Sequence, residues 1–118
     1  MNTDKAPGLI LEVRFYRSAG QNEPVREWLQ SLPRAHKKAI GEDIKTVQFG
    51  WPLGMPVVRK LEAGLWEVRT RLKDSIARVI FTVEGETMVL LHGFIKKSQK
   101  TPKNDIEIAR SRKKDIRG

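Results

Sequence analysis

The chain has no cysteine among its 118 residues. This absence excludes disulfides, catalytic thiols and thiolate metal sites. No apolar run approaches the roughly 18 residues of a membrane-spanning helix, and residues 1–8 lack the apolar segment of a secretory signal. The sequence therefore predicts a small soluble protein, which we expect in the cytoplasm and without a membrane partner.

Two further features of the composition limit the kinds of binding site that we expect. There are only two histidines, His36 and His92, and their spacing does not resemble a metal-ligand motif, so we expect no metal and no other cofactor. Glycines are not grouped before a helix, which argues against a phosphate-binding loop. The length suits one domain over residues 1–118, because two halves would each be too small for an adequate core. We expect residues 1–8 and 111–118 to be flexible.

Positive charge is abundant, and it is concentrated toward the C-terminus. The 23 basic and 14 acidic side chains give a net charge of +9, and nine basic but only three acidic residues follow Phe94. A basic domain of this kind suits a polyanion such as RNA or a ribosome. The alternative is a basic surface that serves solubility alone.

Hydrophobic periodicity predicts an α+β fold. Asn22 and Thr101 are expected to cap helices, and Pro33 to separate two helices of a hairpin. The predicted order is a strand over 9–16, the helical hairpin, strands over 57–61, 65–72, 76–83 and 87–95, and a last helix after Pro102. We expect the later strands to form a twisted antiparallel sheet of three or four strands, with the helices on one face.

Charged residues stand inside these predicted strands. Glu67, Arg69 and Arg71 share one face of a strand, and Arg78 comes from the neighbouring strand. His92 and the pair Lys96–Lys97 lie near the end of the next strand. Because residues at i and i+2 share a face, these groups can converge on the uncovered side of the sheet. Taken one by one, they also fit a solvated face with ordinary ion pairs such as Glu67–Arg69.

Such a cluster suits cleavage of RNA by its own 2′-hydroxyl. Guanidinium groups match phosphoryl oxygens and stabilise the negative charge that develops in the transition state. A histidine near neutral pKa (His92) or a perturbed carboxylate (Glu67) could accept the hydroxyl proton, and the sequence leaves both open. A Ser-His-Asp site is disfavoured, because no nucleophile elbow is present.

The chain also resembles a known family. Segments 20–25 (GQNEPV), 60–62 (KLE), 65–69 (LWEVR), 77–81 (ARVIF) and 90–102 (LLHGFIKKSQKTP) resemble, in this order, the phage-derived branch of the HigB toxins in the RelE superfamily. The likeness spans about residues 9–110. Relatives commonly place a tyrosine near the C-terminal helix, whereas the only tyrosine here is Tyr16 in the first predicted strand.

The resemblance implies the toxin of a type II toxin–antitoxin pair, a RelE-like fold and ribosome-dependent cleavage of messenger RNA. It implies a HigA-like helix-turn-helix antitoxin, a ribosome with messenger RNA in its A site, and operator DNA bound only through the antitoxin complex. By motif, the implied transition-state stabilisers are Arg69, Arg78 and Lys97. The residues expected to hold the RNA are Lys60, Arg71, Lys96 and Lys100. The alternative functions are a non-catalytic RNA or ribosome binder and an inactive regulatory protein that binds the antitoxin.

Overall fold

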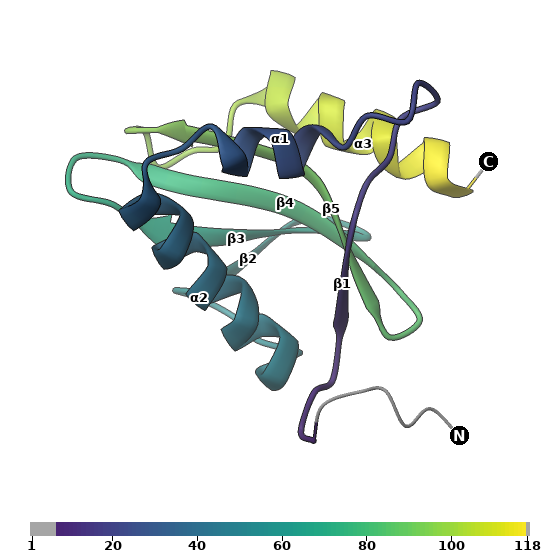
Figure 1. Ribbon diagram of the computed structural model, residues 1–118, viewed down its shortest axis with the longest axis horizontal. Coiled ribbons are helices and arrows are strands. Elements are labelled where there is room, and N and C mark those ends of the chain that lie inside the picture. Colours follow the sequence, from purple (N-terminus) through teal and green to yellow (C-terminus); the bar gives the residue numbers. More distant parts are fainter. Residues whose placement is uncertain (1–6, 118) are drawn as a thin grey trace.

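The computed structural model describes residues 7–117, the last of them through its backbone alone. This part of the chain forms an α+β fold, as predicted (Figure 1). In chain order the elements are β1 (Glu12–Phe15), α1 (Pro24–Gln30), α2 (Arg34–Gly50), β2 (Val58–Glu62), β3 (Leu65–Arg71), β4 (Ile76–Glu84), β5 (Thr87–Lys96) and α3 (Lys103–Arg117). No helix among the described residues is long and apolar enough to cross a membrane.

The five strands form a single twisted sheet in the order β1-β5-β4-β3-β2 (Figure 1). The pairs β2–β3, β3–β4 and β4–β5 are antiparallel, as predicted. Gly85, with a positive φ of 62°, lies in the turn between β4 and β5. The sequence did not indicate how the first strand pairs. In the structure, β1 pairs parallel to β5 and forms that edge of the sheet.

One face of the sheet is covered by α1 and α2, and we call it the helical face. Its core combines Val68, Val79 and Phe81 of the sheet with Ile40 and Ile44 of α2. This packing follows from the strand alternation, because every second residue of β3 and β4 points to the same side. The structure thus confirms the sequence pattern that defined these strands.

The other face is covered in part by α3, and we call it the α3 face. Here Ile80 and Leu91 pack with Ile106 and Ala109 of α3. The expectation that all helices pack on one face is therefore wrong. The apolar stripe of α3 is weak, so the hydropathy pattern did not indicate which face of the sheet the helix packs on. Part of its attachment is polar, since Arg110 forms an ion pair with Glu62 at 2.6 Å.

Polar contacts hold the rest of α3 to the sheet. The Tyr16 hydroxyl donates to Asp115 Oδ2 at 2.6 Å, and Arg112 donates to the Leu91 carbonyl at 2.7 Å. Burial and the bond to Asp115 both raise the pKa of Tyr16, with the hydrogen bond contributing more. Burial lowers the pKa of Arg112. These contacts fasten the helix where apolar packing is sparse.

Two expected helix caps are wrong. The residue before α1 is Glu23, which makes no side-chain capping bond, and the Asn22 backbone donates to the Ser18 hydroxyl. The Thr101 hydroxyl donates to a carboxylate of β3 instead of capping α3. Segment 111–117 is helical, whereas residues 1–6 and 118 lie outside the described residues. The flexibility expected at both ends stays a prediction.

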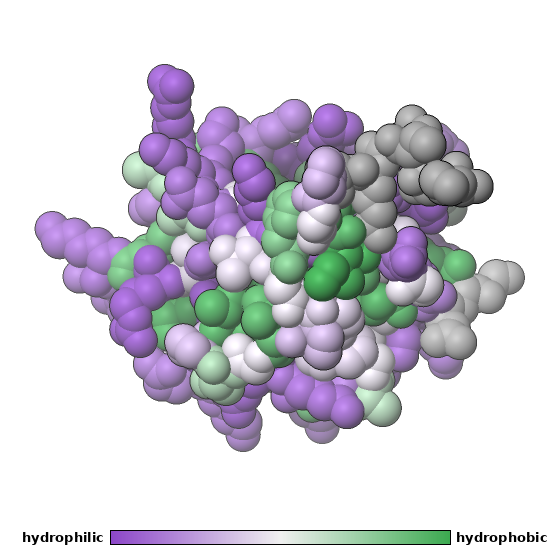
Figure 2. All heavy atoms as spheres, turned by 90° about the horizontal axis from the view of Figure 1, so that it is seen from below, coloured by the Kyte–Doolittle hydropathy of each residue, from purple (hydrophilic) through white to green (hydrophobic). Residues whose placement is uncertain are grey.

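The surface mixes hydrophilic and apolar regions. Figure 2 shows long hydrophilic side chains around the rim of the face seen from below, with apolar side chains toward its middle. The large apolar side chains that are exposed in the described chain are Ile10, Phe49, Met55 and Ile116. On this face, hydrophilic side chains therefore surround a partly apolar middle.

Candidate functional site

The charged residues of β3 and β4 meet on the α3 face. Arg69 and Arg78 occupy directly opposed positions of the antiparallel pair β3–β4. Two like charges in such positions repel each other unless a counter-charge lies nearby. Glu67, two residues before Arg69 on the same face, supplies it, with Oε1 at 3.6 Å from Arg69 Nε. The alternation predicted this shared face from sequence.

Burial makes this cluster unusual. Arg78 and Glu67 are both fully buried, with 0% of each residue exposed. Burial lowers the pKa of Arg78, and the nearby carboxylate of Glu67 acts in the opposite direction. A buried guanidinium requires hydrogen-bond partners, because removing a charge from water is costly. Those partners come from a segment outside the sheet.

The segment 97–101, between β5 and α3, lies over the two arginines, and we call it the covering loop. Arg78 donates to the carbonyls of Ser98 and Lys100, the latter at 3.2 Å. Arg69 donates to the carbonyl and to the side-chain oxygen of Gln99, at 3.0 and 3.1 Å. The expectation of an uncovered cationic face is therefore wrong at Arg78, because backbone carbonyls occupy its terminal nitrogens.

The loop is also fastened through the carboxylate. The Thr101 hydroxyl donates to Glu67 Oε2 at 2.6 Å, and this bond is buried. Arg59 of β2, whose β3 partner is Glu67, donates to the Gln99 carbonyl at 3.4 Å. Sequence analysis missed Arg59, although its position opposite Glu67 places it on the same face. Four side chains of the sheet thus hold one short loop.

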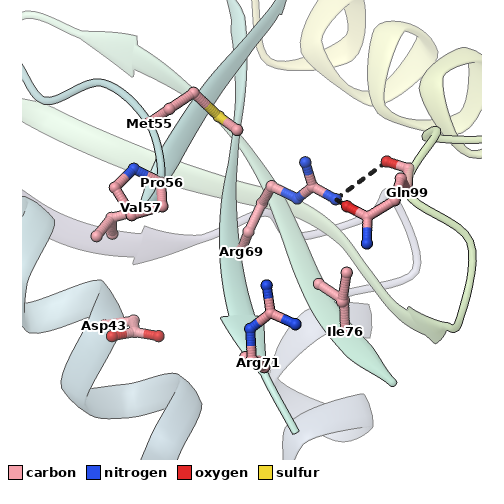
Figure 3. Close-up of a pocket in the computed structure, with 8 residues that line it drawn as sticks. All are labelled: Asp43, Met55, Pro56, Val57, Arg69, Arg71, Ile76 and Gln99. Atoms are coloured by element: carbon pink, nitrogen blue, oxygen red, sulfur yellow. Dashed lines mark hydrogen bonds between the residues drawn. The ribbon is translucent and has the colours of Figure 1, made fainter. Parts of the chain in front are cut away.

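A surface hollow of about 280 Å³ opens beside Arg69. Figure 3 shows Arg69 turned toward Gln99, with Arg71 beside it and Asp43 of α2 across the hollow. Residues 55–57 and Ile76 supply the apolar part of the lining. Arg69 therefore belongs both to the buried cluster and to an accessible cavity, whereas Arg78 does not line the cavity.

A second polar group lies on the same face, farther along β5. His92 Nε2 is 2.7 Å from Asp105 Oδ1, in the first turn of α3. Lys96 Nζ is 3.5 Å from the other carboxylate oxygen. The ring of Phe94 is near both His92 and Arg78, with its centroid 5.5 Å from the imidazole centroid and 5.8 Å from the guanidinium carbon. Asp105 was not predicted as a site residue, because an acid early in a helix is ordinary.

The lysines that were predicted as site residues lie in different parts of the structure. Lys97 and Lys100 are exposed on the covering loop, and Lys96 is exposed at the end of β5. Lys60 pairs with Trp66, whose side chain packs on the helical face, so Lys60 is on the opposite side of the sheet from Arg69. Among residues 7–117, no three His, Asp or Glu side chains are grouped to hold a metal ion.

Comparison with known proteins places the chain in a family. No curated protein matches its sequence. A family described as "Phage derived protein Gp49-like (DUF891)" matches residues 27–114. The chain belongs to this family. The Gp49-like match runs from α1 into α3 and includes the arginine cluster, the covering loop and the His92–Asp105 pair. The prediction of a phage-derived family is confirmed at this level.

One solved structure also resembles the Gp49-like chain. It is a chain of the archaeal RelE-RelB complex from Pyrococcus horikoshii OT3, with 22% sequence identity and a TM-score of 0.47. The match covers 78% of this chain and 100% of that chain.

Proposed function

We propose that this protein is the toxin of a type II toxin–antitoxin pair, of the HigB type, and that it cleaves messenger RNA in the ribosomal A site. The observation that carries the proposal is the opposed pair Arg69 and Arg78 on one sheet face, with Arg69 also lining an accessible hollow. Membership of the Gp49-like family and the net charge of +9 support it. Its partners are then a HigA-like helix-turn-helix antitoxin and the translating ribosome.

RNA cleavage would use the guanidinium N–H groups of Arg69 and Arg78, which bond the covering loop in this structure. Carbonyl oxygens of Ser98, Gln99 and Lys100 accept bonds from the two guanidinium groups. Phosphate oxygens are stronger acceptors, because they carry charge and match the guanidinium geometry. RNA therefore enters at the hollow, where it meets Arg69 and Arg71, and displaces the loop to reach Arg78. Lys97 and Lys100 move with the loop and follow the phosphate backbone.

The test is cleavage of a message on translating ribosomes, mapped by primer extension. The wild-type protein is expected to cut within codons. Arg69→Gln should slow cutting by about 10²-fold or more, the usual loss when one transition-state donor is removed. Arg34→Gln makes the same change of charge at an exposed position of α2 and should cut normally. Equal rates for the two variants would overturn the assigned site, and an intact message with wild-type protein would overturn the enzyme.

A second candidate is a non-catalytic binder that blocks the ribosome. The burial of Arg78 and Glu67 favours it, because both are unavailable to RNA while the covering loop stays in place. Such a binder would stall ribosomes along the message without producing new RNA ends. Primer extension on purified, deproteinised RNA separates the two candidates, since only true cuts persist after the ribosomes are removed.

A further inference from the structure

The pair His92–Asp105 has the geometry of an oriented imidazole. The two atoms that face each other, His92 Nε2 and Asp105 Oδ1, are 2.7 Å apart. Both side chains are largely buried, with 15% and 8% exposed. A short contact between buried groups restricts the rotation of the ring. The imidazole is thus held from one side by α3 while its own strand places it on the α3 face.

Positive groups surround the Asp105 carboxylate. Lys96 approaches Oδ2 at 3.5 Å, and Arg78 of β4 attracts the same side chain. Asp105 also lies in the first turn of α3, where the helix dipole favours negative charge. Its Oδ2 is buried and accepts no hydrogen bond in the described part of the chain. Burying this carboxylate costs free energy of desolvation, and its contact with His92 offsets part of that cost.

This contact selects one form of the neutral ring. A carboxylate accepts a hydrogen bond, so the proton of neutral His92 is on Nε2 and the lone pair is on Nδ1. Among residues 7–117, Nδ1 has no hydrogen-bond partner and is not one of the buried unpaired atoms. Nδ1 is therefore not completely buried, although the side chain as a whole is only 15% exposed. The neutral ring thus keeps an accepting nitrogen, and its strand position opposite Ile80 places it on the sheet face that carries the arginine cluster.

We propose that Asp105 is a positioning residue that holds His92 as the general base of RNA cleavage, an inference that rests on the proposed function. Nδ1 takes the proton of the attacking 2′-hydroxyl while the 2′-oxygen forms its bond to phosphorus and the bond from phosphorus to the 5′-oxygen breaks. Water protonates the departing 5′-oxygen, and the imidazolium returns its proton to solvent. The products are a 2′,3′-cyclic phosphate and a 5′-hydroxyl. The Phe94 ring stacks on the imidazole and lies 5.8 Å from the guanidinium carbon of Arg78, so it is a neighbour of both groups.

The test compares Asp105→Asn with Asp115→Asn. Both residues are carboxylates of α3 that bond a side chain outside the helix, but Asp115 bonds Tyr16, which follows β1, whereas Asp105 bonds His92 of β5. Single-turnover cleavage on programmed ribosomes is measured from pH 5 to 9, together with thermal unfolding of each variant. Asp105→Asn should lower the maximal rate by about 10²-fold with little change in half-saturating concentration, because general-base catalysis contributes about 10²–10⁴-fold. Its rate should also lose the rise with pH that a histidine base gives.

The controls separate positioning from anchoring of the helix. Asp115→Asn should keep the rate and pH profile of the wild-type protein, and Asp105→Glu should recover part of the lost rate. Equal loss in the two Asn variants, or an unchanged pH profile in Asp105→Asn, would overturn the positioning role while cleavage by the wild-type protein still supported the proposed function. If the wild-type protein does not cleave, both proposals are wrong.

Discussion

The covering loop provides the sharpest test of how the site is built. Thr101→Val removes one hydroxyl and keeps the shape of the side chain. The lost bond, 2.6 Å long and buried, joins Thr101 to the fully buried Glu67. Within residues 7–117, Glu67 would then keep Arg69, at 3.6 Å, as its ion-pair partner. A hydrogen bond to a charged group contributes about 1.5–3 kcal/mol, so the free energy of unfolding should fall by about that amount.

This loss converts to a measurable change in melting temperature. For a domain of this size, 1 kcal/mol shifts the midpoint by about 4 °C, so the variant should melt about 6–12 °C lower. Thr46→Val is the matched control, because Thr46 donates to the Glu42 carbonyl on the exposed surface of α2. It should change the midpoint by about 2 °C or less. If the two variants melt together, Thr101 does not hold the loop through Glu67.

Three further predictions follow from other contacts. Tyr16→Phe should destabilise the fold by about 1.5–3 kcal/mol at neutral pH, because it removes the bond to Asp115. That bond raises the pKa of Tyr16 above 10.0, so its contribution is complete below about pH 10 and disappears as the pH rises through the raised value. Urea unfolding should show the two proteins converging at high pH, and a constant difference would contradict this. Gly93→Ala should cost about 1–3 kcal/mol, because its new Cβ would lie 2.4 Å from the ring of Trp28. Gly41→Ala, with nothing within 4 Å, should instead stabilise α2 by up to about 1 kcal/mol, and equal effects in thermal melts would refute the packing. Ribosome affinity should fall roughly 20-fold for a fourfold rise in salt if three phosphates are bound, whereas a flat titration would exclude phosphate contacts.

The sequence predicted what depends on periodicity. Alternation in β3 and β4 placed Arg69 and Arg78 on one face, and the structure pairs them directly. It did not indicate that α3 lies on that face, because Arg110, Arg112 and Asp115 attach the helix by polar bonds. Hydropathy patterns contain no information about such bonds.

The sequence predicted several of the charged side chains of the site, but not the groups that they contact. Carbonyls of the covering loop accept hydrogen bonds from Arg69 and Arg78, and any residue could provide such a carbonyl, so no sequence signal marks them. Because the covering carbonyls leave no trace in the sequence, Arg78 was expected to be accessible. Asp105 was missed because its partner His92 comes from a strand 13 residues away, and only the docking of α3 brings the two together. Lys60, which was expected to hold RNA, lies on the opposite side of the sheet from Arg69, because successive strand residues alternate between faces and Arg59 takes the face of Glu67.

The most direct measurement of the central claim is the chemical nature of the RNA ends left after translation with the purified protein. Metal-independent attack by the 2′-hydroxyl predicts fragments with a 2′,3′-cyclic phosphate and a 5′-hydroxyl, at rates that fall when Arg69 is replaced. Messages that remain full-length, or fragments with 5′-phosphates, would contradict it.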